Sequence, residues 1–272
     1  MSEALKLSRS QRLVQLTRIL VERPGEQIPL SYFTDRFDAA KSTISEDLAL
    51  IKETLEADSS GLLRTHAGAI GGVQYWPLPS PREVQETLAE LCRLLGDPTR
   101  MLPGGFVYMT DIITHPAWSA RIGAMLAARF LPAQPDVVLT VETKGIPLAL
   151  MVARAMGIPM VMARREGRVT EGPSFTMNYI SGSSRRINTM TVGSRALKRD
   201  ARVLIVDDFM KAGATARAMV DLVIEMGAAV AGVGIFVTTA EPRKKRVEEY
   251  TSLLTLVHAD EEERVVEVLP AH

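Results

Sequence analysis

Two adjacent carboxylates, Asp207 and Asp208, follow a run of aliphatic residues and precede a short loop that contains Gly213. The run, Val203-Leu204-Ile205-Val206, predicts a buried strand of a parallel sheet, and residues 214–225 predict a helix. The first turn of such a helix offers free N–H groups and the positive end of a dipole, which suit an anion. Adjacent carboxylates at a strand end can accept hydrogen bonds from a sugar cis-diol. The pattern predicts a sugar-phosphate site, with the diol on the acids and the 5-phosphate in the loop.

The stretch from Val203 to Thr215 resembles the phosphoribosyl pyrophosphate (PRPP) motif of type I phosphoribosyltransferases, in which aliphatic residues precede two acids and a Thr-Gly-x-Thr type loop. Ala212 stands where that family usually has threonine, so one hydroxyl contact to the 5-phosphate is missing. A Walker A loop is excluded, because G-x-x-x-x-G-K-[ST] does not occur in the chain. The resemblance implies that PRPP is bound by Asp207, Asp208, Phe209, Met210, Lys211, Ala212, Gly213, Ala214 and Thr215.

A second strand–loop–helix unit lies upstream, with a buried strand expected over residues 136–141 and a helix over residues 146–156. Between them, Thr143, Lys144 and Gly145 resemble the pyrophosphate loop of the same transferases. Backbone amides made accessible by Gly145, with the Lys144 ammonium beside them, could hold a diphosphate. In that family the loop often contains a non-proline cis peptide, which we expect between Thr143 and Lys144.

Length and composition describe an ordinary globular protein with room for two domains. The chain has 272 residues, of which 46% are hydrophobic, and its 32 basic and 32 acidic side chains leave no net charge. Bulk charge therefore gives no ground for nucleic-acid binding. The single cysteine, Cys92, excludes an intramolecular disulfide and a cysteine-based zinc site, and the four histidines show no ligand spacing, so no metal site is expected. No apolar run reaches membrane-spanning length and no secretion signal is recognised, so we expect a cytoplasmic protein without a membrane partner.

Residues 1–76 predict a small DNA-reading domain. Residues 62–66 and 73–76 flank a glycine-rich turn and predict a β-hairpin, which would be the wing of a winged helix. The hairpin follows three expected helices with short connections, a helix-turn-helix arrangement, over residues 7–22, 30–37 and 41–56.

The first turn of the third helix carries groups suited to DNA phosphates and base edges, and Arg64 in the expected wing completes the DNA-binding set of Lys41, Ser42, Thr43, Ser45 and Arg64. Glu46 and Asp47 would repel the DNA backbone if they faced it, so only the first turn and a half should enter the groove. Residues 1–76 hold nine Lys or Arg against ten Asp or Glu, so a homodimer is expected to bind DNA where a monomer binds poorly. A winged helix that only mediates protein contacts remains an alternative.

The proline-rich run of residues 77–81 is expected to be a stiff spacer at the start of an effector domain, residues 77–272. Alternating strands and helices predict an α/β fold there, with a mainly parallel sheet and ligand loops at the carboxyl ends of its strands. Residues 175–180 and 187–192 predict a hairpin. The surrounding segment, residues 164–199, holds eight basic residues against two acids, which fits either a lid over the ligand or a surface for the DNA backbone.

The two halves together resemble the purine operon repressors of Gram-positive bacteria, with a winged helix-turn-helix domain before a type I phosphoribosyltransferase-like domain. The resemblance rests on residues 41–48 (KSTISEDL), 169–172 (VTEG), 181–186 (SGSSRR) and the D-D-F-M-K-A-G form of the PRPP motif. It implies a dimeric repressor of purine biosynthesis genes whose transferase-like fold has become a sensor without catalytic residues. No cofactor is required. PRPP, with or without Mg²⁺, would release operator DNA, and guanosine tetraphosphate is a candidate antagonist in the same pocket.

Two other functions stay open on the sequence. The first is a purine phosphoribosyltransferase with a regulatory DNA-binding domain, which would need a pocket for the base, usually with an aromatic side chain to stack on it. The second is a PRPP sensor that controls RNA or a protein partner, which the winged helix disfavours.

Overall fold

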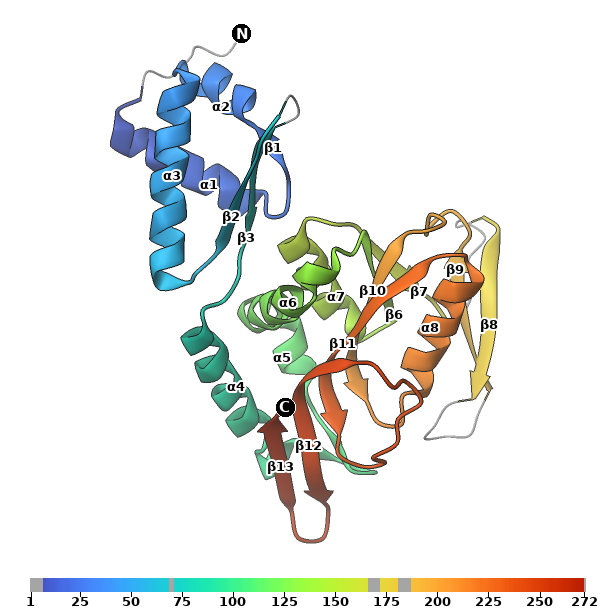
Figure 1. Ribbon diagram of the computed structural model, residues 1–272. Helices are drawn as coiled ribbons and strands as arrows, with labels where there is room; N and C mark the ends of the chain where they lie inside the picture. Colours follow the sequence, from blue (N-terminus) through green and yellow to red (C-terminus); the bar gives the residue numbers. More distant parts are fainter. Residues whose placement is uncertain (1–6, 69–70, 166–171, 181–186, 272) are drawn as a thin grey trace. The chain divides into compact units, whose positions relative to one another are not determined.

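The computed structural model describes residues 7–68, 71–165, 172–180 and 187–271 (Figure 1). The chain divides into two compact units. The winged-helix unit comprises Met1–Pro81 with Arg154–Gly157, and the sheet unit comprises Arg82–Ala153 with Ile158–His272.

The winged-helix unit packs three helices against a small antiparallel sheet, as the sequence predicts. The helices are α1 (Arg9–Glu22), α2 (Leu30–Phe37) and α3 (Lys41–Asp58). The sheet has the strand order β1-β3-β2, with β1 (Ile28–Pro29), β2 (Leu62–His66) and β3 (Gly72–Trp76). β1 was not predicted, because it has only two residues, one of them a proline without an N–H to donate. The shared core includes the fully buried side chains of Leu16, Ile28, Phe33 and Ile44.

The sheet unit is built on a six-stranded sheet with the order β13-β12-β11-β10-β6-β7. All neighbouring strands pair in parallel except β13, which is antiparallel to β12. The mainly parallel α/β fold is thereby confirmed. The strands are β6 (Val137–Val141), β7 (Met160–Ala163), β10 (Arg202–Met210), β11 (Ala229–Thr239), β12 (Thr251–Asp260) and β13 (Val265–Pro270).

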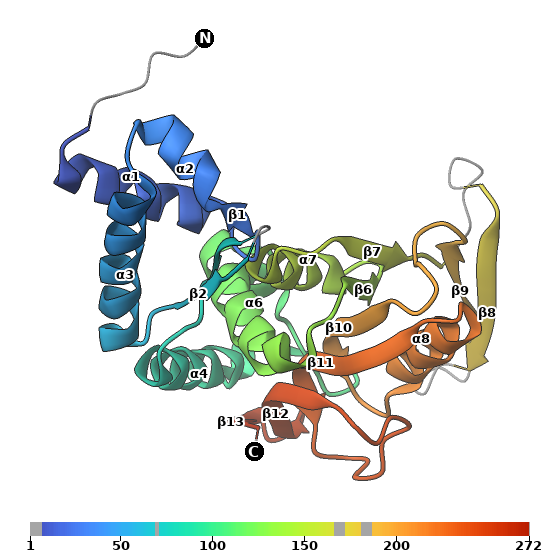
Figure 2. The same cartoon turned by 45° about the horizontal axis from the view of Figure 1, so that its top comes forward.

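Helices cover both faces of this sheet (Figure 1, Figure 2). Val233 of β11 packs in a core cluster with residues of α8 (Ala214–Glu225). Its neighbours Gly232 and Gly234 face the other way. A Cβ at Gly232 would lie 2.5 Å from the ring of Phe130, so glycine lets α6 (Pro116–Phe130) approach that face closely. The remaining helices are α4 (Pro81–Leu95), α5 (Thr110–Thr114), α7 (Gly145–Met156) and the short 3₁₀ turns η1 (Pro98–Arg100) and η2 (Leu131–Ala133).

Two small ribbons complete the sheet unit. The predicted hairpin is present as β8 (Ser174–Ile180) paired with β9 (Ile187–Gly193), while residues 181–186 and 166–171 lie outside the described part of the chain. The other ribbon contains β5 (Phe106–Val107), which ends two residues before Met109, the residue that precedes α5. β5 pairs with β4 (Met101–Leu102). Within the described residues, no helix combines the length and apolar character needed to cross a bilayer.

Candidate functional site

A pocket of about 520 Å³ lies at the carboxyl end of β10. Its floor is the loop that connects β10 to α8, and Gly104 and Phe106 come to it from the β4–β5 ribbon. The structure therefore brings nearly all of the predicted PRPP-motif residues into one cavity. The lining comprises Gly104, Phe106, Asp207, Phe209, Met210, Lys211, Ala212, Gly213, Ala214, Thr215 and Ala216, with Asp208 outside this set.

The two acids lie within β10, whereas the sequence placed them after its end. Backbone pairing with β11 continues past them, with Asp207 opposite Ile235 and Met210 opposite Thr238. Because side chains alternate along a strand, Asp207 and Phe209 share one face and Asp208 takes the other. Both acids are nevertheless linked, since the N–H of Asp208 donates to Asp207 Oδ1 at 3.0 Å.

Burial governs the charge of this pair. Asp207 is 6% exposed, and burial raises the pKa of its carboxyl well above the ordinary value, with the neighbouring charge of Asp208 as the second cause. Burial also raises the pKa of Asp208, while its side-chain hydrogen bond with Asp207 and the charge of Lys144 oppose that rise. Burial and mutual repulsion thus disfavour two full negative charges on this pair. A ligand that donates hydrogen bonds to carboxylates would restore them.

The loop after β10 has the geometry of an anion site. Gly213 has φ +80°, a left-handed conformation that favours glycine, and it caps α8 with no side-chain hydrogen bond. The first-turn N–H groups of α8 therefore have no capping side chain and open onto the pocket. Lys211 lines the pocket beside them, and its Nζ lies 5.5 Å from the centre of the Phe106 ring.

Phe106 is a pocket residue that sequence reasoning missed. Its ring lies 6.0 Å from that of Phe209, centre to centre, at 56°, so the two aromatic side chains form one wall. Phe106 lies on the β4–β5 ribbon, and a residue far along the chain holds that ribbon in place. The N–H groups of Gly104 and Gly105 both donate to Glu261 Oε1, at 2.6 and 3.2 Å. No local pattern in the sequence pairs Glu261 with these two glycines, because 156 and 157 positions separate them.

The predicted pyrophosphate loop lies beside the acids, and Thr143, Lys144 and Gly145 do not line the pocket described above. A Cβ built on Gly145 would lie 3.1 Å from Asp207 Oδ1, which shows how closely the loop approaches the carboxylate. The expected cis peptide occurs one residue earlier than predicted, between Glu142 and Thr143. The sequence holds no local signal, such as a proline, that distinguishes the two bonds.

The exposed face of α3 carries most of the predicted DNA-binding residues. Lys41, Ser42 and Ser45 are exposed and Thr43 is half-buried, while Arg64 of β2 is exposed with its guanidinium 5.4 Å from the Trp76 ring centre. A groove of about 500 Å³ opens beside Lys41 and includes residues that the sequence analysis did not select. These are Ser31 and Thr34 of α2 and Thr65 and His66 of β2, among others.

Asp47 does not face outward with these residues. It is 1% exposed, and its carboxylate accepts hydrogen bonds from Arg9 at 3.1 Å and Arg12 at 2.5 Å. Its charge is neutralised inside the unit, so of the two acids Glu46 and Asp47 only Glu46 is exposed. The expected repulsion by two acids is thereby reduced to one.

Comparisons with known proteins match both units. Residues 8–77 match the family described as "Bacterial purine repressor, N-terminal", and residues 109–270 match the phosphoribosyl transferase domain. The adenine phosphoribosyltransferase of Rhodothermus marinus superposes with a TM-score of 0.53 over 63% of this chain and 99% of that chain, at 22% identity. That likeness shows the fold of the sheet unit.

Two curated proteins are similar over the whole length. The purine biosynthesis transcriptional repressor PurR of Bacillus subtilis is 45% identical over 264 residues, which is 97% of this chain and 93% of that protein. The purine biosynthesis transcriptional activator PurR of Lactococcus lactis subsp. lactis is 38% identical over 262 residues, which is 96% of this chain and 97% of that protein. The chain therefore belongs to the PurR family of bacterial purine biosynthesis regulators, in which a purine repressor N-terminal domain precedes a phosphoribosyltransferase domain.

Proposed function

We propose that the protein is a transcriptional repressor of purine biosynthesis genes that binds operator DNA and is released by PRPP. One observation carries the proposal. In a chain of this family, the pocket at the end of β10 brings together a buried carboxylate, a lysine and the start of a helix that no side chain caps. A sugar diol, a 5-phosphate and a diphosphate are the groups that such a set can hold.

The ligand is bound in three parts. Its ribose diol donates to Asp207 and Asp208, its 5-phosphate meets the N–H groups that start α8, and its diphosphate approaches Lys144 and the loop at Gly145. Thr215 supplies a hydroxyl, and Ala212 supplies none. Two adjacent carboxylates also suit Mg²⁺, so binding is measured with and without that ion. Guanosine tetraphosphate carries diphosphate groups too and would compete for the same pocket.

DNA is bound by the exposed start of α3 and the groove beside it. Lys41 and Arg64 supply positive charge, and hydroxyl groups of Ser42 and Ser45 supply donors for phosphates and base edges. A homodimer presents two such faces to the two halves of an operator, which offsets the lack of a basic excess in each copy. PRPP releases the DNA only to the extent that it binds the free protein more tightly than the bound one.

The rival function is a purine phosphoribosyltransferase, and one observation favours it. Phe106 and Phe209 form an aromatic wall inside the pocket, which is the kind of surface on which a purine base stacks. Against it stand the missing hydroxyl at Ala212 and the curated relatives that match over the full length, which are named transcriptional regulators. We therefore assign the pocket to sensing without turnover.

The test is fluorescence anisotropy at fixed salt, with DNA from upstream of the host's purine genes and PRPP as titrant. Specific binding that is lost with PRPP, but not with ribose 5-phosphate, is the expected result. Lys41→Ala should weaken DNA binding. Lys52→Ala also removes one positive charge from α3, but farther from its start, and should leave DNA binding unchanged. Binding that PRPP leaves unchanged would contradict release by this ligand, and release of pyrophosphate from PRPP and a purine base would establish the transferase instead.

The sign of regulation needs its own measurement, because relatives are named both repressor and activator. In transcription from a purine promoter with purified polymerase, added protein should lower the yield of transcript and PRPP should restore it. A rise on addition of protein would show an activator.

A further inference from the structure

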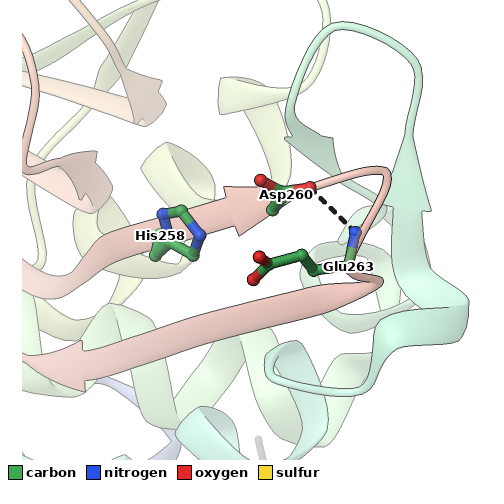
Figure 3. Close-up of side chains that lie close together, drawn as sticks. All are labelled: His258, Asp260 and Glu263. Atoms are coloured by element: carbon green, nitrogen blue, oxygen red, sulfur yellow. Dashed lines mark hydrogen bonds between the residues drawn. The ribbon is translucent and has the colours of Figure 1, made fainter.

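Three side chains with metal-binding atoms converge at the turn between β12 and β13 (Figure 3). Their ligand atoms, one each from His258, Asp260 and Glu263, all lie within 4.8 Å of one another. His258 and Asp260 are two residues apart on β12 and so share a face of the strand. Glu263 extends from the turn back over that face. The cluster lies outside the pocket assigned to PRPP.

The turn itself holds Asp260 in position. Asp260 Oδ1 accepts hydrogen bonds from the N–H groups of Glu262 at 2.8 Å and Glu263 at 2.9 Å. The second carboxylate oxygen accepts no hydrogen bond from the described residues and stays available.

The surroundings lack the positive charge that would neutralise these acids. Residues 258–267 include five acids and a single basic residue, Arg264. Across the part of the chain that the structure describes, none of the ion pairs involves Asp260, Glu263 or Glu267. Glu267 pairs directly with His258 in the β12–β13 register and therefore points to the same face.

We propose that this turn is a binding site for a divalent transition-metal ion of the Zn²⁺, Co²⁺ and Ni²⁺ class, held by His258, Asp260 and Glu263. An imidazole nitrogen together with carboxylates selects that class, whereas Mg²⁺ and Ca²⁺ prefer oxygen ligands alone. Ligand atoms lie about 2.0–2.2 Å from a zinc ion, so the three must close to roughly 4 Å or less. His258 and Glu263 are exposed and can rotate to do so.

The site has a structural consequence, because Glu261 lies between two of its ligands. Glu261 holds the N–H groups of Gly104 and Gly105, the glycines that lead to Phe106. An ion that fixes the turn therefore also fixes this contact. Slower hydrogen exchange at Gly104 and Gly105 in the presence of the ion is the expected sign.

The test uses the full-length chain without a histidine tag, freed of metal by a chelator, and isothermal titration with ZnCl₂. One equivalent should bind to the wild-type protein, and MgCl₂ should not compete for it. His258→Ala should weaken binding about 10-fold or more, and Glu263→Gln should weaken it several-fold. Glu262→Gln is the matched control: it removes the same charge from the same turn, yet its side chain is not in the cluster, so affinity should stay within about twofold.

A second measurement separates coordination from loose attraction to acidic residues. CoCl₂ bound to the wild-type chain should give visible d–d absorption bands that disappear in His258→Ala, because these bands change with the ligands of the ion. An unchanged zinc affinity in His258→Ala, or an equal loss in Glu262→Gln, would overturn the proposal, as would the absence of any binding by the wild-type protein.

Discussion

Glu261 accepts a hydrogen bond of 2.6 Å from the N–H of Gly104, a residue 157 positions earlier in the chain. This single carboxylate ties the β12–β13 turn to the ribbon that brings Phe106 to the pocket. The shape of the ligand pocket therefore depends on a residue that lies outside both predicted ligand loops.

Removal of this contact should loosen the pocket without unfolding the protein. Glu261→Ala leaves two N–H groups to water, and because the site is exposed the cost should be no more than about 1 kcal/mol, or roughly a five-fold loss of PRPP affinity. Glu262→Ala changes the next residue of the turn and should leave the affinity as it was. Isothermal titration with PRPP measures both, and equal affinities for the two variants would show that the contact does not shape the pocket.

Asp47 should be essential to the stability of the winged-helix unit. Asp47→Asn leaves Arg12, whose side chain is 12% exposed, without its anionic partner, and Arg9 at 61% exposure loses less. Loss of a buried pair partner costs about 3–5 kcal/mol, so with one arginine exposed we expect about 2–3 kcal/mol. Urea unfolding of the variant measures this cost. Glu46→Gln, on the exposed side of the same helix, should change stability by less than about 0.5 kcal/mol.

The raised pKa of Asp207 makes stability depend on pH in a definite direction. A carboxyl whose pKa is higher in the folded state than in the unfolded state takes up a proton on folding. Its contribution to the free energy of unfolding is complete below the unfolded-state pKa and is lost as the pH rises through the folded-state pKa. Asp207→Asn abolishes this loss of stability at high pH, because an amide does not ionise. The variant should be more stable than wild type at pH 7–8, and the difference should shrink towards pH 4.

The same substitution should abolish stabilisation by PRPP, because an amide cannot supply the negative charge that the ligand's diol requires. Thermal unfolding at several pH values, with and without PRPP, gives both results at once. Asp221→Asn, which alters an acid on α8 paired with Arg217, serves as the control and should retain the response to PRPP. A variant that is less stable than wild type at pH 8 would contradict the assigned cost of burying Asp207.

Local patterns predicted the elements of this chain well. The bounds of α2 and α8 agree with the structure residue for residue, because apolar spacing and the turn residues around each helix act within one or two turns. Of the residues predicted to bind PRPP, Asp207, Lys211 and Gly213 line one pocket, because the motif that holds them is contiguous in the sequence. The end of β10 was predicted too early, because pairing with the neighbouring strand β11 continues past Asp207.

The contacts that escaped prediction join residues far apart in the chain. The hydrogen bond from Gly104 to Glu261 and the ion pair of Arg12 with buried Asp47 both join distant segments. No local sequence pattern predicts either contact, because each forms only when the fold brings those segments together. The cluster at His258 escaped for a different reason. The four histidines show no ligand spacing among themselves, and the partners of His258 are two carboxylates within five residues.

Gly145 tests how closely the second loop must approach Asp207. A Cβ at this position would lie 2.4 Å from Thr140 Oγ1 and 3.1 Å from Asp207 Oδ1, and Thr140 is fully buried with its hydroxyl unpartnered among the described residues. Gly145→Ala should therefore displace the loop, lower stability by about 1–3 kcal/mol and weaken PRPP binding. If the clash with Thr140 is the cause, Thr140→Ala should be nearly neutral alone and should recover most of the loss in the double variant. If the double variant loses as much stability as the two single variants together, the strain does not come from the clash with Thr140. If Gly145→Ala binds PRPP as tightly as the wild-type protein, this loop does not contribute to PRPP binding.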